Sequence, residues 1–235
     1  MGAVTSDLDR ASVEKAYARW APVYDLVFDN VMAAGRRAAV AAASRAGTEI
    51  LDVGVGTGLE LPYFERRARV IGVDLSEPML RKAQERAVQR RLAQVRGLCV
   101  MDAARLAFAD AAFDAVIAPY VITVVPQPEA TLDEFVRVVR PGGEVVLVNH
   151  VAAEEGLRAT IERWLARQTR QLGWRPEFPW SRIAAWSARH GGVEIVERRT
   201  LPPFDLFTLI RLRRRAAGVE DAGQAAAIRS MRRSP

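Results

Sequence analysis

Short apolar runs alternate with amphipathic segments through most of the chain. The runs are rich in valine, isoleucine and leucine and predict buried strands over residues 49–54, 68–74, 95–100, 114–118 and 144–149. The segments between them repeat apolar residues every three or four positions and predict helices over residues 33–46, from 59 onward, 76–91 and 128–139. This alternation predicts an α/β fold with a doubly wound parallel sheet, in which ligands bind at the carboxyl ends of the strands.

The last third of the chain has a different pattern. Residues 154–172 and 179–190 have helical spacing, and two further apolar runs, 193–202 and 204–213, are close enough to pair as an antiparallel hairpin. A turn is expected at Arg140-Pro-Gly-Gly143. Beyond Ala216 no apolar period remains, and that tail is expected to be disordered.

An aromatic stripe precedes the predicted sheet. Val13, Tyr17, Trp20 and Tyr24 recur three and four positions apart, and Pro22 interrupts the helix that they predict. The stripe is expected either to cover a ligand as a lid or to be the packed face of the helix. The resulting division is residues 1–34 as lid or membrane-contact helices, 35–215 as the α/β domain and 216–235 as a basic tail.

Composition narrows the class of protein. The chain has 235 residues and a mass of 25.9 kDa, of which 50% are hydrophobic and 26% charged, as in one globular domain. No run has the length of a membrane span, no signal peptide is evident, and Cys99 is the one cysteine, expected in the core. A cytoplasmic location is therefore expected.

The net charge of +6 is concentrated near the C-terminus. Residues 211–235 contain seven arginines and two acidic residues, so the preceding part of the chain carries only +1. This segment is compatible with phospholipid head groups, nucleic acid or water as its surroundings.

A glycine-rich loop carries the main chemical information. The run Asp52-Val-Gly54-Val-Gly56-Thr-Gly58 joins a strand to the expected helix, where glycines and a helix N-terminus admit a ligand close to the backbone. Asp74 follows at the end of the next strand, where a carboxylate can accept both hydroxyls of a ribose. Leu59 stands where a dinucleotide fingerprint has its third glycine, and Asp52 suits a cofactor with an amino-acid end.

These motifs, with Gly72-Val-Asp74-x-Ser-x-x-Met79, Met101-Asp-Ala103 and Arg140-Pro-Gly-Gly143, resemble class I S-adenosylmethionine-dependent methyltransferases over about residues 12–215. The resemblance implies a mostly parallel seven-stranded sheet with N-terminal lid helices. It also implies S-adenosyl-L-methionine as cofactor, S-adenosyl-L-homocysteine as product, and cofactor contacts at Tyr24, Asp52, Gly54, Gly56, Gly58, Asp74, Leu75, Met79, Met101, Asp102, Ala103 and Pro119. No metal site is expected.

Two short stretches are similar to the bacterial phosphatidylethanolamine N-methyltransferases: residues 17–28, with Tyr24-Asp25, and Val148-Asn149-His150. This similarity implies stepwise methylation of phosphatidylethanolamine, through mono- and dimethyl forms, toward phosphatidylcholine. The ubiquinone and menaquinone C-methyltransferases also open with a helix containing Tyr-Asp, and another small-molecule methyltransferase remains an alternative.

Three residues are candidates for catalysis: Tyr24, His150 and Tyr120. Ala118-Pro119-Tyr120 resembles a shortened form of the loop that some N-methyltransferases use to accept an amine. The amine proton has three candidate acceptors, His150, Tyr24 and a backbone carbonyl near Pro119. Each aromatic or histidine side chain also has a purely structural interpretation, as a packed or hydrogen-bonded core residue. His190, beside a predicted helix end, is expected to be only a cap.

The expected partners are a phospholipid substrate and an anionic membrane surface. The surface would be met by the N-terminal segment, with Lys15, Arg19 and Phe28, and by Arg211–Arg215. Nucleic acid is not expected as a partner, and the protein is expected to be a monomer lying peripherally at the inner face of the membrane.

Overall fold

A computed structural model describes residues 32–150, 178–202 and 207–216. A helix over residues 32–46 precedes the sheet. The elements that follow are β1 (Glu49–Val53), η1 (Leu61–Tyr63), β2 (Arg69–Asp74), α2 (Glu77–Gln89), β3 (Val95–Val100), β4 (Phe113–Pro119), α3 (Pro128–Val138), β5 (Val139–Asn149), α5 (Trp180–His190), β6 (Val193–Leu201) and β7 (Phe207–Arg214).

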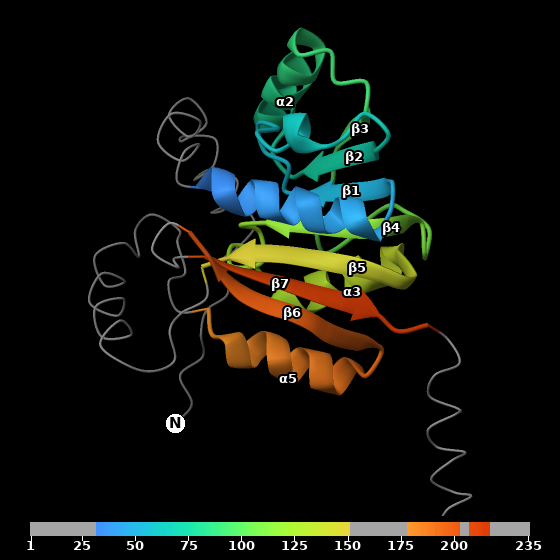
Figure 1. The fold of residues 1–235 in the computed structure, drawn as a ribbon, viewed down its shortest axis with the longest axis vertical. Helices are drawn as coiled ribbons and strands as arrows, with labels where there is room; N and C mark the ends of the chain where they lie inside the picture. The colour runs from blue at the N-terminus through green and yellow to red at the C-terminus, as the bar shows by residue number, and fades with distance from the viewer. Residues whose placement is uncertain (1–31, 151–177, 203–206, 217–235) are drawn as a thin grey trace, which may run out of the picture.

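The seven strands form one sheet in the order β3-β2-β1-β4-β5-β7-β6 (Figure 1). Strands β1 to β5 are parallel, and β7 runs antiparallel to both of its neighbours, β5 and β6. The chain reverses beside β1, where it crosses from β3 on one side to β4 on the other, and such a reversal leaves a crevice at the carboxyl ends of the strands. The expected mostly parallel, seven-stranded α/β sheet is confirmed.

Helices cover both faces of the sheet. The 32–46 helix and α2 pack on one face through small side chains such as Ala39, Ala43 and Ala83. On the other face, α3 and α5 pack through larger side chains, among them Phe135 and Trp186. Burial on both faces explains why the central strands are apolar without alternation.

Two local expectations from sequence were wrong. After Gly58 there is no α-helix but the three-residue 3-10 helix η1. The residue that follows it, Phe64, has extended backbone (φ −69°, ψ 138°). The turn at residues 140–143 does not separate α3 from a strand but lies within β5, where the pairing with β4 jumps from Val139 to Glu144. The hairpin predicted near the C-terminus is confirmed as β6 and β7.

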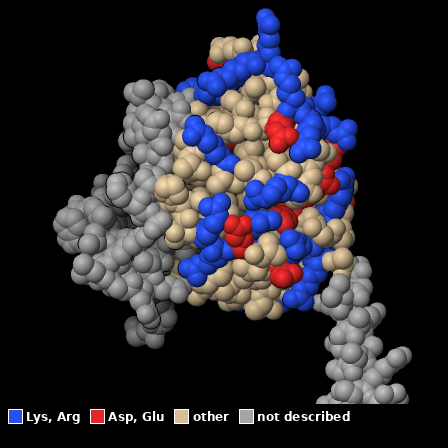
Figure 2. Space-filling model, viewed as in Figure 1, with Lys and Arg blue, Asp and Glu red and all other residues tan. Residues whose placement is uncertain are grey.

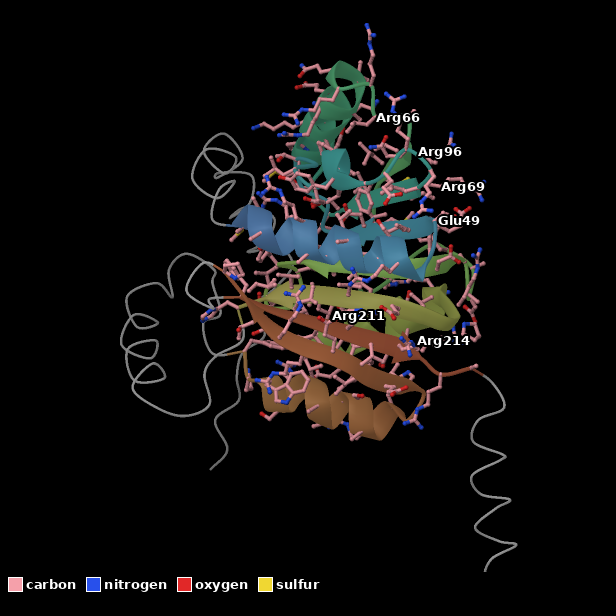
Figure 3. The ribbon with its side chains drawn as sticks, viewed as in Figure 1. Glu49, Arg66, Arg69, Arg96, Arg211 and Arg214 are labelled. Carbon is pink, nitrogen blue, oxygen red and sulfur yellow. The ribbon has the colours of Figure 1, made fainter. Side chains whose placement is uncertain are left out.

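The arginines of β7 are held in ion pairs and hydrogen bonds. Arg211 donates to both carboxylate oxygens of Glu144 at 2.8 Å and to Glu197 at 2.7 Å. Arg213 also donates to Glu144, and Arg214 donates to three carbonyls at the end of α3 and the start of β5. Figure 3 shows Arg211 and Arg214 along this strand. The positive cluster at residues 211–214 is therefore largely built into the fold, which weakens the expectation that it faces a membrane.

Three further arginines of the described residues lie away from the carboxyl ends of the strands. Arg66, Arg69 and Arg96 lie near the opposite ends of β2 and β3 (Figure 3), and Arg69 is paired there with Glu49. Basic and acidic side chains are interspersed over the face seen in Figure 2.

Several expectations concern residues outside the described ranges: the aromatic stripe with Tyr17, Trp20 and Tyr24, the membrane-contact residues Lys15, Arg19 and Phe28, the helix over 154–172 and the tail from 217. Among the described residues, no helix combines the length and the apolar character that a membrane span requires.

Candidate functional site

A pocket opens at the carboxyl ends of β1, β2 and β4. Its walls come from the loop after β1, the end of β2, the loop after β3 and the turn after β4. Nine expected site residues line it: Gly54, Gly56, Asp74, Leu75, Met79, Met101, Asp102, Ala103 and Pro119, together with the catalytic candidate Tyr120. The pocket is therefore at the edge of the sheet where the sequence placed it.

The glycine loop has the backbone that the motif requires. Gly54, Gly56 and Gly58 have φ values of 71°, 53° and 74°, in the left-handed region that favours glycine. A Cβ atom on Gly54 would lie 2.3 Å from Val121, and one on Gly58 would lie 2.6 Å from Leu61. Gly54 and Gly56 line the pocket, whereas Gly58 lies against Leu61 and Ala83 and does not line it.

Asp74 is held in place by main-chain amides. Its Oδ2 accepts a hydrogen bond from Gly56 N–H at 2.8 Å, and its Oδ1 accepts one from Ser76 N–H at 2.8 Å. Burial raises the pKa of this carboxyl, and the amides of Ser76, Gly56 and Leu75 partly offset that effect. Each oxygen keeps a second lone pair, so the side chain can accept hydrogen bonds from two ribose hydroxyls.

A mostly apolar slot lies beside Asp74. Leu75 comes from the turn between β2 and α2, buried Met79 from the first turn of α2, and Met101 and Ala103 from the loop after β3. Asp102 Oδ1 accepts the amide of Ala104 at 3.0 Å, which orients its carboxylate in that loop. Such a slot suits a flat aromatic ring, and the carboxylate of Asp102 can accept a hydrogen bond from an exocyclic amine.

Tyr120 closes the end of the pocket near β4. Its φ of 66° is unusual for a residue other than glycine, and its hydroxyl donates to the carbonyl of Met32 at 2.8 Å. The ring meets Phe207 edge to face, with centroids 5.0 Å apart. The hydroxyl thus fastens the 32–46 helix to the turn after β4, and what remains available to a ligand is the ring.

His150 does not line the pocket. It follows β5 at the correct edge of the sheet, but its side chain is buried. Its neighbour Asn149 is also buried, and Asn149 Nδ2 donates to Thr123 Oγ1 at 3.2 Å. Tyr24, the third catalytic candidate, lies outside the described residues. His190, expected as a cap, ends α5 and accepts the amide of Gly192 at Nδ1.

Asp52 lies beneath the glycine loop and not in the pocket wall. It is fully buried, and neither of its carboxylate oxygens meets an N–H or O–H donor among the described residues. Two residues that the sequence did not single out surround it: Glu60, 5% exposed, and Arg36, 3% exposed, both of which line the pocket. Glu60 follows the last glycine by two positions, and Arg36 comes from the 32–46 helix, so only the fold brings them together.

These residues fit the cofactor that the resemblance implies. S-adenosylmethionine has an adenine, a ribose and an amino-acid end, and the site offers an apolar slot, a fixed carboxylate and a buried acid–arginine group. Asp52 and Glu60 suit an ammonium, and Arg36 suits a carboxylate. The group of three lies where no pyrophosphate could be accommodated beside Asp52 and Glu60 without repulsion of like charges.

Comparisons with known proteins agree with this geometry. The family model described as a methyltransferase domain matches residues 51–147. Phosphatidylethanolamine N-methyltransferase of Cereibacter sphaeroides is 42% identical over 204 residues, covering 87% of this chain and 98% of that protein. Demethylmenaquinone methyltransferase of Thermobifida fusca is 33% identical over 203 residues, covering 79% of this chain and 84% of that protein.

Among solved structures, 1,6-didemethyltoxoflavin-N1-methyltransferase of Burkholderia thailandensis, with bound S-adenosylhomocysteine, has a TM-score of 0.68 at 20% identity. The match covers 92% of this chain and 93% of that one. At this identity the likeness concerns the fold.

Proposed function

The chain belongs to the S-adenosylmethionine-dependent methyltransferases, and from this we propose that its acceptor is the amine of phosphatidylethanolamine. The observation that carries the proposal is the 42% identity to a phosphatidylethanolamine N-methyltransferase along nearly the whole of that protein. The menaquinone enzyme is similar over less of its length and at lower identity. A quinone precursor is therefore the second candidate acceptor.

The chain's residues have three tasks in such a reaction. The cofactor, when bound, supplies a methyl group on a positively charged sulfur, and the transfer needs no covalent enzyme intermediate. Asp74 and the glycine loop would hold its ribose, since the Asp74 carboxylate is already fixed by the amides of Gly56 and Ser76. Val121, Val124 and Val125 line the pocket with apolar side chains, which exclude water from the transfer and favour an uncharged amine.

The amine must lose a proton before each transfer, because its nitrogen lone pair forms the new bond to carbon. A primary amine is mostly protonated at neutral pH. We propose His150, Tyr24 or the carbonyl near Pro119 as the group that accepts this proton, and the ring of Tyr120 as a face that holds the partly methylated ammonium. His150, Pro119 and Tyr120, the candidates within the described residues, lie at the carboxyl ends of β4 and β5.

The proposed acceptor also implies a place of action. The head group of phosphatidylethanolamine lies at a membrane surface, so the protein would act there peripherally, at the cytoplasmic face. The N-terminal segment, with Lys15, Arg19, Trp20, Val27 and Phe28, supplies both basic and apolar side chains for such contact. Arg211 and Arg214 are not proposed as membrane contacts, because both donate hydrogen bonds to partners within the fold.

A labelled-methyl experiment tests the proposal. The full chain is incubated with methyl-labelled S-adenosylmethionine and, separately, with phosphatidylethanolamine vesicles, phosphatidylcholine vesicles and demethylmenaquinone. We expect labelled mono-, di- and trimethylated lipid from the first and none from the second, which has the same phosphate but no free amine. Label on the quinone, with none on the amine, would overturn the lipid assignment in favour of the second candidate.

A further inference from the structure

The amino-acid end of the pocket has more negative than positive charge. Three carboxyl groups meet there: Asp52 at the end of β1, Glu60 in the loop that follows and Asp74 at the end of β2. One guanidinium, that of Arg36, faces them from the 32–46 helix. Asp52, Glu60 and Arg36 are at most 5% exposed, so water screens these charges poorly.

Such a group cannot remain fully ionised without a further cation. The charge of Glu60 raises the pKa of Asp52, so two buried carboxyl groups at these positions do not both ionise unless a cation offsets their charge. No donor among the described residues meets the carboxylate oxygens of Asp52. The carboxyl pair is thus complete only with a proton or with a positively charged ligand.

We propose that the Asp52–Glu60 pair holds a proton in the free protein and releases it when the ammonium of the cofactor enters, so that cofactor binding is coupled to proton release. The ammonium binds at Glu60, which lines the pocket, and its charge offsets that of the two carboxylates in place of the shared proton, while the displaced proton passes to solvent. The inference assigns Glu60, together with Asp52, as the residues that select a ligand with a charged amino group. It concerns the cofactor alone and does not depend on which acceptor is methylated.

The electrostatics of the pair support this exchange. Burial raises the pKa of Glu60 to about 7, with Arg36 acting in the opposite direction and Asp74 adding to the rise. Burial, followed by the charge of Glu60, also raises the pKa of Asp52 well above its usual range. An α-amino group ordinarily has a pKa of about 7.7–8.0. At pH 6 the ligand therefore arrives charged while the pair is still protonated, and one proton has to leave.

Calorimetry measures the released proton directly. S-adenosylhomocysteine has the same amino-acid end as the cofactor and undergoes no transfer, so it is titrated into the full chain at pH 6 in two buffers with different ionisation enthalpies. We expect the two binding enthalpies to differ by nearly the difference between the ionisation enthalpies of the two buffers, as release of close to one proton requires. Affinity should also rise about fivefold from pH 6 to pH 7, since the slope of the logarithm of the binding constant equals the number of protons released.

Adenosine and two variants separate this role from a structural one. Adenosine has the same base and ribose but no amino group, and we expect its binding enthalpy to be independent of buffer. Glu60→Gln should abolish the proton release with S-adenosylhomocysteine and weaken its binding at pH 7 at least tenfold, while adenosine binding stays within twofold. Asp52→Asn provides the second test if the first variant folds poorly. Equal enthalpies in both buffers, or the same release with adenosine, would overturn the proposal.

Discussion

Asp74 and Gly56 are joined by a hydrogen bond of 2.8 Å from the Gly56 amide to Asp74 Oδ2. The bond connects the glycine loop after β1 to the end of β2, so the two most informative sequence features of the site are parts of one structure. Ser76 N–H holds the other oxygen of the same carboxylate. The carboxylate is therefore fixed in orientation before any ligand arrives, which reduces the entropic cost of binding a ribose.

Replacing Asp74 should weaken cofactor binding strongly. Asp74→Ala removes two charge-assisted hydrogen bonds to the ribose, each contributing about 1.5–3 kcal/mol at most, and we expect the affinity for S-adenosylhomocysteine to fall at least tenfold. Titration calorimetry measures this change. Glu65→Ala is the control, because Glu65 is exposed and its ion-pair partner among the described residues is the exposed Arg67. An Asp74→Ala protein that is folded and binds as the unaltered chain does would show that the ribose lies elsewhere.

The sequence was sufficient for those parts of the site that lie within one motif. The glycines, Asp74 and the Met101–Ala103 loop each have a local pattern, and all but Gly58 line the pocket. Arg36 and Glu60 have no such pattern, because they belong to the site only through their burial beside Asp52 in the folded chain. The predicted strand correctly put His150 at the edge of the sheet where the pocket opens. The direction of its side chain depends on packing, which sequence spacing does not determine.

The same distinction applies to the fold. Strand–helix alternation predicted the order and type of the central elements because buried parallel strands have a strong apolar pattern. The helix predicted after Gly58 was wrong. Pro62 would be the fourth residue of a helix that begins at Leu59, and it lacks the amide hydrogen for the bond to the preceding turn, so the segment contains only η1. The arginines of β7 looked like a free basic cluster because their partners, Glu144 and Glu197, come from strands distant in sequence.

Arg211 should be important for stability. Its side chain is 17% exposed and that of Glu144 is 5% exposed, so Arg211→Met leaves a buried carboxylate with only Arg213 beside it. We expect the free energy of unfolding to fall by about 3 kcal/mol in urea denaturation. Arg81→Met is the matched control: its ion pair with Glu77 is exposed, and its loss should cost less than about 0.5 kcal/mol. Equal effects of the two substitutions would contradict the structural role of Arg211.

The hydroxyl and the ring of Tyr120 should have separable effects. Tyr120→Phe removes the hydrogen bond to the Met32 carbonyl and should lower the free energy of unfolding by about 1 kcal/mol, with methyl transfer largely retained. Tyr120→Leu also removes the aromatic face and should lower turnover further. Thermal melts and initial rates on the same samples test both statements. A large loss of turnover in the phenylalanine variant alone would instead make the hydroxyl a catalytic group.

His150 is tested by a substitution that keeps its polarity. If His150 accepts the amine proton, we expect His150→Gln to lower turnover on phosphatidylethanolamine vesicles by about 100-fold, since removal of a general base has effects of that order. The thermal midpoint and the affinity for S-adenosylhomocysteine should hardly change. Tyr24→Phe is measured in parallel, because Tyr24 is the other side-chain candidate. Unchanged rates in both variants would leave the carbonyl near Pro119 as the acceptor.

The buried Glu60 should make stability depend on pH in the absence of ligand. Burial raises its pKa from 4.5 to about 7 in the folded protein, so the folded state favours the protonated carboxyl. Its contribution to stability is complete below about pH 4.5 and is lost as the pH rises through 7. Glu60→Gln has the shape of the protonated form and cannot ionise, and it should therefore match the unaltered chain at low pH and exceed it at high pH.

Urea denaturation of both proteins at pH 5 and pH 8 measures this difference. We expect the variant's advantage in free energy of unfolding to be larger at pH 8 by about 1–3 kcal/mol, the upper value corresponding to the full change in pKa. Glu65→Gln, at an exposed position, should show no such change between the two pH values. The comparison reports on Glu60 together with its effect on Asp52, because the charge of Glu60 also raises the pKa of Asp52. If the curves of Glu60→Gln and the unaltered chain stay parallel, Glu60 is ionised in the free protein, and a proton held near the amino-acid end of the pocket must then reside on Asp52.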